Sequence, residues 1–237
     1  QVAGAVNVAL HNVDGVQVSG AVNVAANDVR RTQVAGAFNY GRTVAGAQVS
    51  GAFNVARGTV GGGQVSGAFN YARSVTGGQV SGCFNVALDT VRGGQVGVFN
   101  LACVVRGGQV GILNFSDTIT GGCVGLFSFA WRGYHRFEAV TTDAMPLSLR
   151  FRTGTRGFHN ILGFSPALAA DGRWGVLYGF GTEPRLGDRL FLDIDLTAEQ
   201  VVERPTWVDA WNILQRLDLR LGYRPFRHVV ITAGPAL

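Results

Sequence analysis

Apolar and polar residues follow one another in a short recurring pattern through the first half of the chain. The segment Gln-Val-Ser-Gly-Ala-Phe-Asn returns, with small variations, from Gln1 to about Phe129, at intervals of fourteen to sixteen residues. Eight copies at so regular a spacing are typical of repeat proteins, in which each unit buries its apolar face only against its neighbours. The pattern ends near Trp131, so the sequence predicts a repeat domain over 1–130 and a second domain over 131–237.

Each repeat predicts one longer strand, one shorter strand and two corners. In the longer strand, Val18, Val22 and Val24 share one parity, while Gln17 and Asn23 share the other, which gives an apolar and a polar face. We therefore expect valine, phenylalanine and tyrosine to point inward. Glycines, often in pairs, supply the backbone angles of a tight corner. Such a unit suits one coil of an all-β solenoid, whose coils stack about 4.8 Å apart.

Stacked coils bring like residues of successive repeats into columns. The expected columns are an amide ladder and an internal stack of aromatic rings, which would hold the coils together. The ladder is predicted to consist of Asn23, Asn39, Asn54, Asn70, Asn85, Asn100 and Asn114, and the core stack of Phe38, Phe53, Phe69, Phe84 and Phe99.

The last repeats are one residue shorter than the earlier ones. A deletion within a strand turns every later side chain to the opposite face, unless a β-bulge absorbs the extra residue of the longer units. We place such bulges at Gly20, Gly51, Gly67 and Gly82. The competing topology is a continuous antiparallel meander or β-barrel, in which each repeat is one strand. The meander explains the Gly-Gly corners, but it explains less well why polar residues and length variation fall in mid-repeat, so the solenoid is favoured.

Past Trp131 the repeat disappears and longer two-residue alternation begins. Apolar residues alternate with charged or small ones over 147–152, 190–196 and 217–223. This pattern predicts an antiparallel sheet with one apolar and one polar face, either barrel-like with its apolar side toward lipid or part of a sandwich. The segment 229–237 has the pattern of a strand that continues past Leu237, so this module is expected to be incomplete there. A brief helix or a loop is expected at 206–211, since Pro205 suits a helix start.

Arginine supplies all the positive side-chain charge. The chain has 237 residues, with 20 Lys+Arg, none of them lysine, and 15 Asp+Glu, for a formal net charge of +5. This balance suits contact with phosphate or lipopolysaccharide. The basic runs with interleaved aromatics that are typical of nucleic-acid binders are missing, so nucleic acid is not an expected partner. The longest apolar stretch, 123–131, is too short for a membrane-spanning helix, so membrane placement would need a β-barrel or a lipid anchor.

No set of residues has the spacing of a catalytic or metal site. The cysteines Cys83, Cys103 and Cys123 occupy three different positions of the repeat, which fits neither a disulfide ladder nor a metal site, and His11, His135, His159 and His228 are scattered. Asp193 and Asp195 lie two apart on one strand face, as glycosidase carboxylates can, but like charges so placed more often meet arginines. The sequence predicts a non-enzymatic protein with no metal and no cofactor.

A motif in the last repeats resembles that of a known family. The rhythm Gly-x-Gln-Val-Gly-x-x-Asn-x-Ala, clearest at 94–102 and 108–115, is similar to that of bacterial surface-repeat proteins of spirochaete and related Gram-negative envelopes. In these proteins the repeats are often followed by a Gly-Tyr-His segment and a β-rich tail, as at 133–135 and onward here. The first six units depart from the motif by their inserted residue. The resemblance implies a cell-surface or outer-membrane location and no established activity.

These features together predict an envelope protein that presents solenoid faces to a protein partner in an envelope assembly or to a surface glycan. Its second domain is expected to tether it to the outer membrane or to a larger assembly. One alternative is an outer-membrane barrel or pore in which the repeats are strands. A less favoured alternative is a solenoid enzyme acting on polysaccharide. That enzyme would need a cluster of acids on one repeat face, whereas the acids of the first half are only Asp14, Asp28, Asp89 and Asp117, all near corners.

Overall fold

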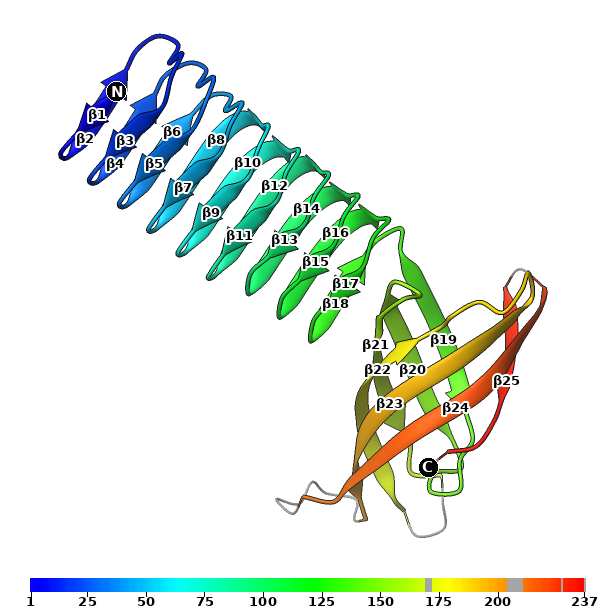
Figure 1. Cartoon of the computed structure of the whole chain (residues 1–237). Coiled ribbons are helices and arrows are strands. Elements are labelled where there is room, and N and C mark those ends of the chain that lie inside the picture. Colours follow the sequence, from blue (N-terminus) through cyan, green and yellow to red (C-terminus); the bar gives the residue numbers. More distant parts are fainter. Residues whose placement is uncertain (169–171, 204–210, 227, 237) are drawn as a thin grey trace. The chain divides into compact units, whose positions relative to one another are not determined.

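The computed structural model divides the chain into two compact units, 1–132 and 133–237 (Figure 1). The structure describes residues 1–168, 172–203, 211–226 and 228–236. The regular elements of these residues are all β-strands, and none of the described segments forms a helix that is long and apolar enough to cross a membrane. The brief helix or loop expected at 206–211 falls mainly on 204–210, which lies outside the described residues.

Unit 1 is a solenoid whose coils contribute one strand to each of two nine-stranded parallel sheets. Sheet A contains β1 (Val2–Ala3), β3 (Gln17–Ser19), β5 (Gln33–Ala35), β7 (Gln48–Ser50), β9 (Gln64–Ser66), β11 (Gln79–Ser81), β13 (Gln95–Val96), β15 (Gln109–Val110) and β17 (Cys123–Val124). Sheet B contains β2 (Val6–Ala9), β4 (Val22–Ala25), β6 (Phe38–Gly41), β8 (Phe53–Val60), β10 (Phe69–Val75), β12 (Phe84–Val91), β14 (Phe99–Val105), β16 (Leu113–Ile119) and β18 (Phe127–Ala130).

Like residues of successive coils pair directly, as the solenoid requires. Asn70 of β10 lies opposite Asn54 of β8, and the two strands run parallel. The same register holds in sheet A, where Gln79 of β11 lies opposite Gln64 of β9. The predicted solenoid is confirmed, and the antiparallel meander through the repeats is wrong.

The faces of the solenoid strands are the reverse of those expected from hydrophobicity. In β3, Gln17 and Ser19 are buried while Val18 is exposed, and in β4 Asn23 is fully buried while Val22 and Val24 lie toward the outside. The apolar part of the core is built only from small side chains, in two columns: an alanine column represented by Ala56 and a valine column represented by Val60. A coil this thin has no room for an inward phenylalanine ring.

The residues assigned to β-bulges lie instead at the corner between the two sheets. Gly20 and Ala21 connect β3 to β4, and Gly82 and Cys83 connect β11 to β12 in the same way. The bulge prediction for Gly20, Gly51, Gly67 and Gly82 is therefore wrong. The shorter coils lose one residue of the sheet-A strand, and the corner restores the register, so that Phe99 still lies opposite Phe84.

Glycine is required at this corner by the close approach of neighbouring coils. A Cβ atom built on Gly20 would overlap the carbonyl oxygen of Gly4 in the preceding coil, and one on Gly36 would overlap that of Gly20. The clash is with backbone, which cannot move aside without breaking the ladder of the sheets. The recurring glycine therefore sets how tightly the coils stack.

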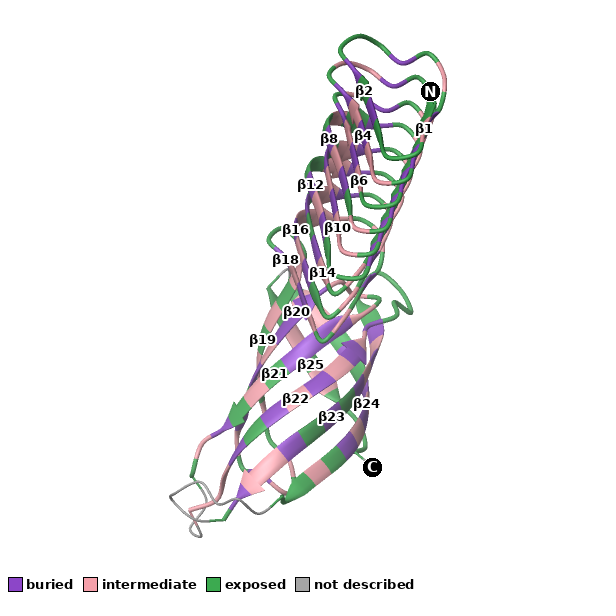
Figure 2. Cartoon of the chain, turned by 90° about the vertical axis from the view of Figure 1, so that its left-hand side faces the viewer, coloured by how far each residue is buried: buried purple, intermediate pink, exposed green. Residues whose placement is uncertain are grey.

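Unit 2 is a curled antiparallel sheet of seven strands in which each strand pairs with the next along the chain (Figure 1). Its strands are β19 (Tyr134–Val140), β20 (Ser148–Gly154), β21 (His159–Ser165), β22 (Trp174–Thr182), β23 (Leu190–Val202), β24 (Ile213–Phe226) and β25 (Val229–Ala233). The predicted antiparallel, barrel-like module is confirmed. Figure 2 shows buried and exposed positions alternating along these strands.

The concave side of the curled sheet is polar and its convex side is apolar. Arg150 and Arg152 of β20 are at most 1% exposed, whereas Leu149, directly before Arg150, is 49% exposed. In β23, Asp193 and Asp195 are fully buried and Leu196 is 59% exposed. This is the opposite of the polarity expected for a sheet that packs on an apolar core in water.

Candidate functional site

The asparagine ladder lies inside the solenoid and joins consecutive coils. Each Asn Nδ2 donates a hydrogen bond to Oδ1 of the asparagine in the following coil, for example from Asn54 to Asn70 at 3.0 Å and from Asn70 to Asn85 at 3.0 Å. The series runs through Asn7, Asn23, Asn39, Asn54, Asn70, Asn85, Asn100 and Asn114 and ends on Ser128 Oγ. All seven predicted members are thus brought into one column.

A second ladder of glutamines, not anticipated from the sequence, runs beside the first. Gln64 Nε2 donates to Gln48 Oε1 at 2.7 Å, and Gln79 Nε2 donates to Gln64 Oε1 at 2.7 Å, so these bonds point toward the preceding coil. The asparagine bonds point the other way, and the amide dipoles of the two ladders therefore oppose each other. The signal for this ladder was the unvarying glutamine that opens eight of the nine coils.

The two ladders also connect the two sheets across the narrow interior. Asn70 Nδ2 reaches from sheet B to the backbone oxygen of Val80 in sheet A at 2.7 Å, and Gln64 Nε2 reaches from sheet A to the backbone oxygen of Tyr71 in sheet B at 2.9 Å. Both of these amide nitrogens thus donate at least two hydrogen bonds, which removes the penalty of burying them.

The phenylalanines predicted as an internal stack lie on the outer face of sheet B. Phe53 is 47% exposed and Phe84 is 49% exposed, while Phe38, Phe69 and Phe99 are half-buried. Neighbouring rings do contact each other along the face, with centroids 6.5 Å apart for Phe53 and Phe69 and 5.7 Å apart for Phe84 and Phe99. The core-stack prediction is wrong in its placement, because the interior is occupied by the amides.

A network of buried ion pairs fills the concave side of the curled sheet. Arg152 of β20 lies at its centre and donates from Nη1 to Asp193 Oδ1 at 2.8 Å and from Nη2 to Asp195 Oδ2 at 2.5 Å. Arg220 of β24 also contacts both carboxylates, approaching Asp193 Oδ2 at 3.2 Å, and Arg136 of β19 reaches Asp193 Oδ2 at 2.8 Å. The sequence-based expectation that these aspartates meet arginines is confirmed.

The network continues to the residue that follows β22. Glu183 is 2% exposed and accepts hydrogen bonds from Arg136 Nη1 at 2.7 Å and from the Tyr134 hydroxyl at 2.8 Å. Arg224 Nη2 lies 3.2 Å from the other oxygen of the same carboxylate. Sequence reasoning missed Glu183, Tyr134 and Arg136, because their partners lie 41 to 57 residues away in the chain.

Glycines on one strand make room for the charged side chains of the strands around it. A Cβ atom on Gly181 of β22 would overlap Asp195 and lie 2.5 Å from His159 Nε2, and one on Gly175 would lie 2.8 Å from Glu199 Oε1. The concave side at this level is therefore filled by side chains.

Three residues of the network have donor atoms close enough to share a metal ion. His159, Asp193 and Asp195 each place one such atom within 4.8 Å of the others. Their ligand atoms are already engaged by arginine: Arg152 Nη1 donates to His159 Nε2 at 2.8 Å, and the two carboxylates bind Arg152 and Arg220. The arrangement is that of an ion-paired structural network, since a cation would have to displace guanidinium groups.

The other candidate residues are not brought together into a site. The thiols of Cys83 and Cys103 are exposed, and Cys123 is buried in the glutamine column, opposite Gln109. Burial raises the pKa of the Cys123 thiol above its usual range. His11, His135 and His228 are exposed and lie on separate elements.

Comparison with known proteins gives no relative on which to base a function. No protein-family model, no curated protein and no solved structure matches this chain. Its function has to be argued from the two units themselves, in which buried polar networks are combined with apolar outer surfaces.

Proposed function

We propose that the protein is a non-enzymatic structural or interaction protein of a Gram-negative cell envelope, anchored in the outer membrane by the curled sheet of unit 2. The observation that carries this proposal is the polarity of that sheet. Its outward positions are apolar or uncharged along all seven strands, and its inward positions hold arginine, aspartate and glutamate. Lipid-facing strands of membrane barrels alternate in this way, apolar outside and polar inside.

Aromatic residues near the strand ends support the same placement. Phe158 directly precedes β21 and Phe180 lies near the end of β22, with their ring centroids 5.3 Å apart. Phe164 and Trp174 lie at the other end of the same two strands, 6.3 Å apart. Aromatic side chains at both ends of an apolar band are typical of membrane proteins, because these rings favour the lipid–water boundary.

The pore-type alternative receives less support than the anchor. A conducting channel needs an open polar interior, whereas Arg152, Asp193, Asp195 and Arg220 bind one another across the concave side of unit 2. An enzyme acting on polysaccharide is likewise not favoured, since the carboxylates in this cluster are all held by arginine.

The anchor is tested by reconstituting the full chain with lipid vesicles and measuring flotation and heat-modifiable gel migration. The wild-type chain is expected to float with the vesicles, to need detergent for extraction and to migrate differently after boiling. Leu196→Arg, which puts a charge on the convex side, should weaken insertion by about 2–4 kcal/mol if the residue lies near the bilayer centre. The matched control is Leu186→Arg, because Leu186 is exposed outside the strands. Equal heat-modifiable gel migration of both variants, or a wild type that stays in solution without detergent, would refute the anchor.

A further inference from the structure

The outer face of sheet A is a smooth apolar strip. Each of its nine strands presents one valine outward, and these valines are 37% exposed at Val18 and 49% exposed at Val110. Glycines flank this column over most of its length, at positions such as Gly78 and Gly82. No charged residue occurs within the strands of sheet A.

The corner that joins the two sheets is apolar as well. Its outward residues stack through backbone hydrogen bonds, for example from Cys83 N to Ala68 O and from Ile112 N to Val98 O. The side chains become larger toward the later coils, where Val98 is 43%, Ile112 47% and Leu126 54% exposed.

The outer face of sheet B continues this apolar surface. Beyond the column of Phe53 and Phe84, a second outward column holds residues such as Val86 and Phe115, and Phe99 and Phe115 pack with ring centroids 5.6 Å apart. We call the outer face of sheet A, the corner and these two columns of sheet B together the apolar wedge.

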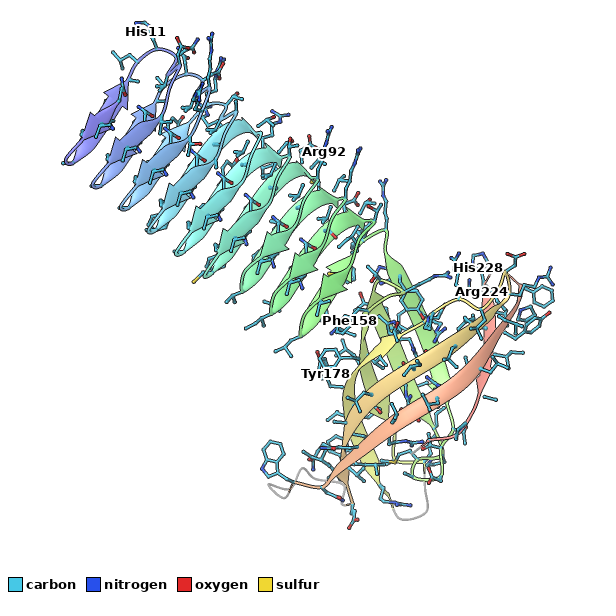
Figure 3. All side chains as sticks on the ribbon, viewed as in Figure 1. His11, Arg92, Phe158, Tyr178, Arg224 and His228 are labelled. Atoms are coloured by element: carbon cyan, nitrogen blue, oxygen red, sulfur yellow. The ribbon has the colours of Figure 1, made fainter. Side chains whose placement is uncertain are left out.

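The charges of unit 1 all lie outside this wedge. Arg57, Arg73 and Asp117 occupy the next outward column of sheet B, and the other charged residues lie in the last residues of a sheet-B strand or in the segment that follows it. Its eight arginines and four aspartates, a net charge of +4, each fall between the inward alanine position of sheet B and the start of the next coil. Figure 3 shows this polar edge, with His11 and Arg92 along the same long side of the solenoid. The segregation is complete over nine coils, which a surface bathed in water on all sides does not require.

We infer that the solenoid is itself a lipid-binding element, which buries the apolar wedge in the acyl region of an anionic lipid layer and keeps its polar edge at the headgroups. A rigid protein partner or a glycan chain would cover one flat face and leave the other face and the corner in water. Lipid chains can surround both faces and the corner at once. Apolar surface on this scale marks an interaction or membrane site rather than a free surface.

The polar edge indicates which lipids the wedge would meet. Guanidinium groups bind phosphate oxygens through paired N–H donors. The ion pairs of unit 1 involve Arg30, Arg42 and Arg132. Within residues 1–132, all of which the structure describes, Arg57, Arg73 and Arg92 on the edge are therefore not engaged by a carboxylate. A glycan is the weaker candidate, because the wedge offers few polar side chains for sugar hydroxyls. The inference depends on unit 1 alone, and it stands or falls separately from the anchor of unit 2.

The test measures the depth of a fluorophore on the solenoid of the full-length chain in phosphatidylglycerol–phosphatidylcholine vesicles. One variant carries the probe on Cys83 at the corner, with Cys103→Ser, and the matched control carries it at Thr90→Cys on the polar edge, with Cys83→Ser and Cys103→Ser. We expect the Cys83 probe to shift to the blue and to be quenched by lipids brominated in their acyl chains, and the Thr90 probe to remain in water. Omitting phosphatidylglycerol should weaken the effect.

A second pair of variants separates this inference from the anchor. Val49→Glu, Val65→Glu and Val80→Glu together charge the wedge at outward positions, whereas Thr43→Glu, Thr59→Glu and Thr90→Glu place the same charges on the polar edge. The first set should reduce quenching of the Cys83 probe more than about tenfold, and the second, carrying the same probe, should leave it nearly unchanged.

A Cys83 probe that stays in water while the chain floats refutes the wedge but not the anchor. A probe that enters lipid in a chain whose gel migration does not change on boiling refutes the anchor but not the wedge. Burial of the probe without lipid, by a second copy or by added polysaccharide, refutes the lipid assignment.

Discussion

The solenoid and the curled sheet both bury polar side chains and expose apolar ones. They differ in how the buried polar groups find their hydrogen-bond and ion-pair partners. In unit 1 neutral amides bind the same amide one coil away, so a single pairing is repeated along the stack. In unit 2 full charges bind partners on other strands, and each contact is unique, as between Arg152 and Asp195. Repetition therefore spreads the cost of a defect over neighbours in the solenoid, whereas the curled sheet concentrates its polar interactions in one cluster.

The largest effect is expected from removing a carboxylate of the cluster. Asp195→Ala leaves the Arg152 and Arg220 guanidinium groups buried without this partner, and breaking a buried pair from one side costs about 3–5 kcal/mol. Thermal unfolding of unit 2 in detergent, followed by gel migration, measures the loss. The control Asp188→Ala removes an exposed aspartate outside the strands and should change little. Equal effects of the two substitutions would mean that the cluster does not hold the sheet together.

A somewhat smaller loss is expected from interrupting the amide ladder. Asn70→Leu removes the amide donor to Asn85 Oδ1 and to Val80 O, whereas Asn54 Nδ2 loses one bond and keeps its bond to Val65 O. Each unsatisfied buried group costs about 1–3 kcal/mol. We expect a destabilisation of about 2–4 kcal/mol, because small shifts of the neighbouring coils recover part of the loss. Chemical unfolding of the solenoid tests this, with Arg73→Leu as the exposed control on the same strand. A variant as stable as the control would show that stacked backbone bonds alone suffice.

A glycine of the curled sheet tests how tightly its concave side is filled. In Gly181→Ala the new methyl group overlaps Asp195 and crowds His159, and overpacking of this kind costs about 1–3 kcal/mol. Gly157→Ala is the matched control, since a Cβ atom there has open space around it. The comparison is made by thermal unfolding in detergent, and a neutral Gly181→Ala would mean that the cluster can shift to make room.

The sequence could predict the stacking of the solenoid, but not which face of each strand lies inside. Regular spacing requires like residues to lie above one another, whatever the polarity, and so the asparagine ladder was predictable. Orientation was inferred from hydrophobicity, which fails here because the amides of Gln64 and Asn70 find partners along the stack and across it. The thinness of the coil, which excludes Phe69 from the interior, appears only once both sheets are placed.

For the curled sheet, the sequence predicts the strands and their faces but not the individual contacts between them. Alternation gave its strands and its two faces, and the pairing of Asp193 and Asp195 with arginine followed from charge alone. Which arginines take part depends on strand order and register, since Arg152 reaches a strand about forty residues later. The recess at Gly181 has no local signal at all, because it is defined by the side chain of Asp195 on the neighbouring strand.

A smaller loss of stability is expected from the outward phenylalanine column of sheet B. Phe84→Ala should lower the stability of the lipid-free solenoid by less than about 1 kcal/mol, because half of that side chain is already exposed. Val91→Ala, at a fully buried position of the same strand, should cost more despite removing fewer atoms. Unfolding curves of the two variants decide the matter, and the reverse order would contradict the outward placement of the rings.

The smallest effect is expected from an exposed pair on the polar edge, where unit 1 does use full charges. Arg42 Nε and Nη2 donate to the Asp28 carboxylate at 3.1 and 2.9 Å, and this contact lowers the pKa of Asp28. A lowered folded-state pKa means that the pair stabilises the solenoid above the ordinary carboxyl pKa, and that this contribution disappears as the pH falls through the lowered value. Asp28→Asn should therefore reduce the melting temperature slightly at neutral pH and not at all in strong acid, since both forms are then uncharged at this position. Adding Arg42→Gln to Asp28→Asn should cause no further change at either pH. A neutral-pH loss as large as that of Asn70→Leu would show that charge, and not the amide ladders alone, holds the coils together.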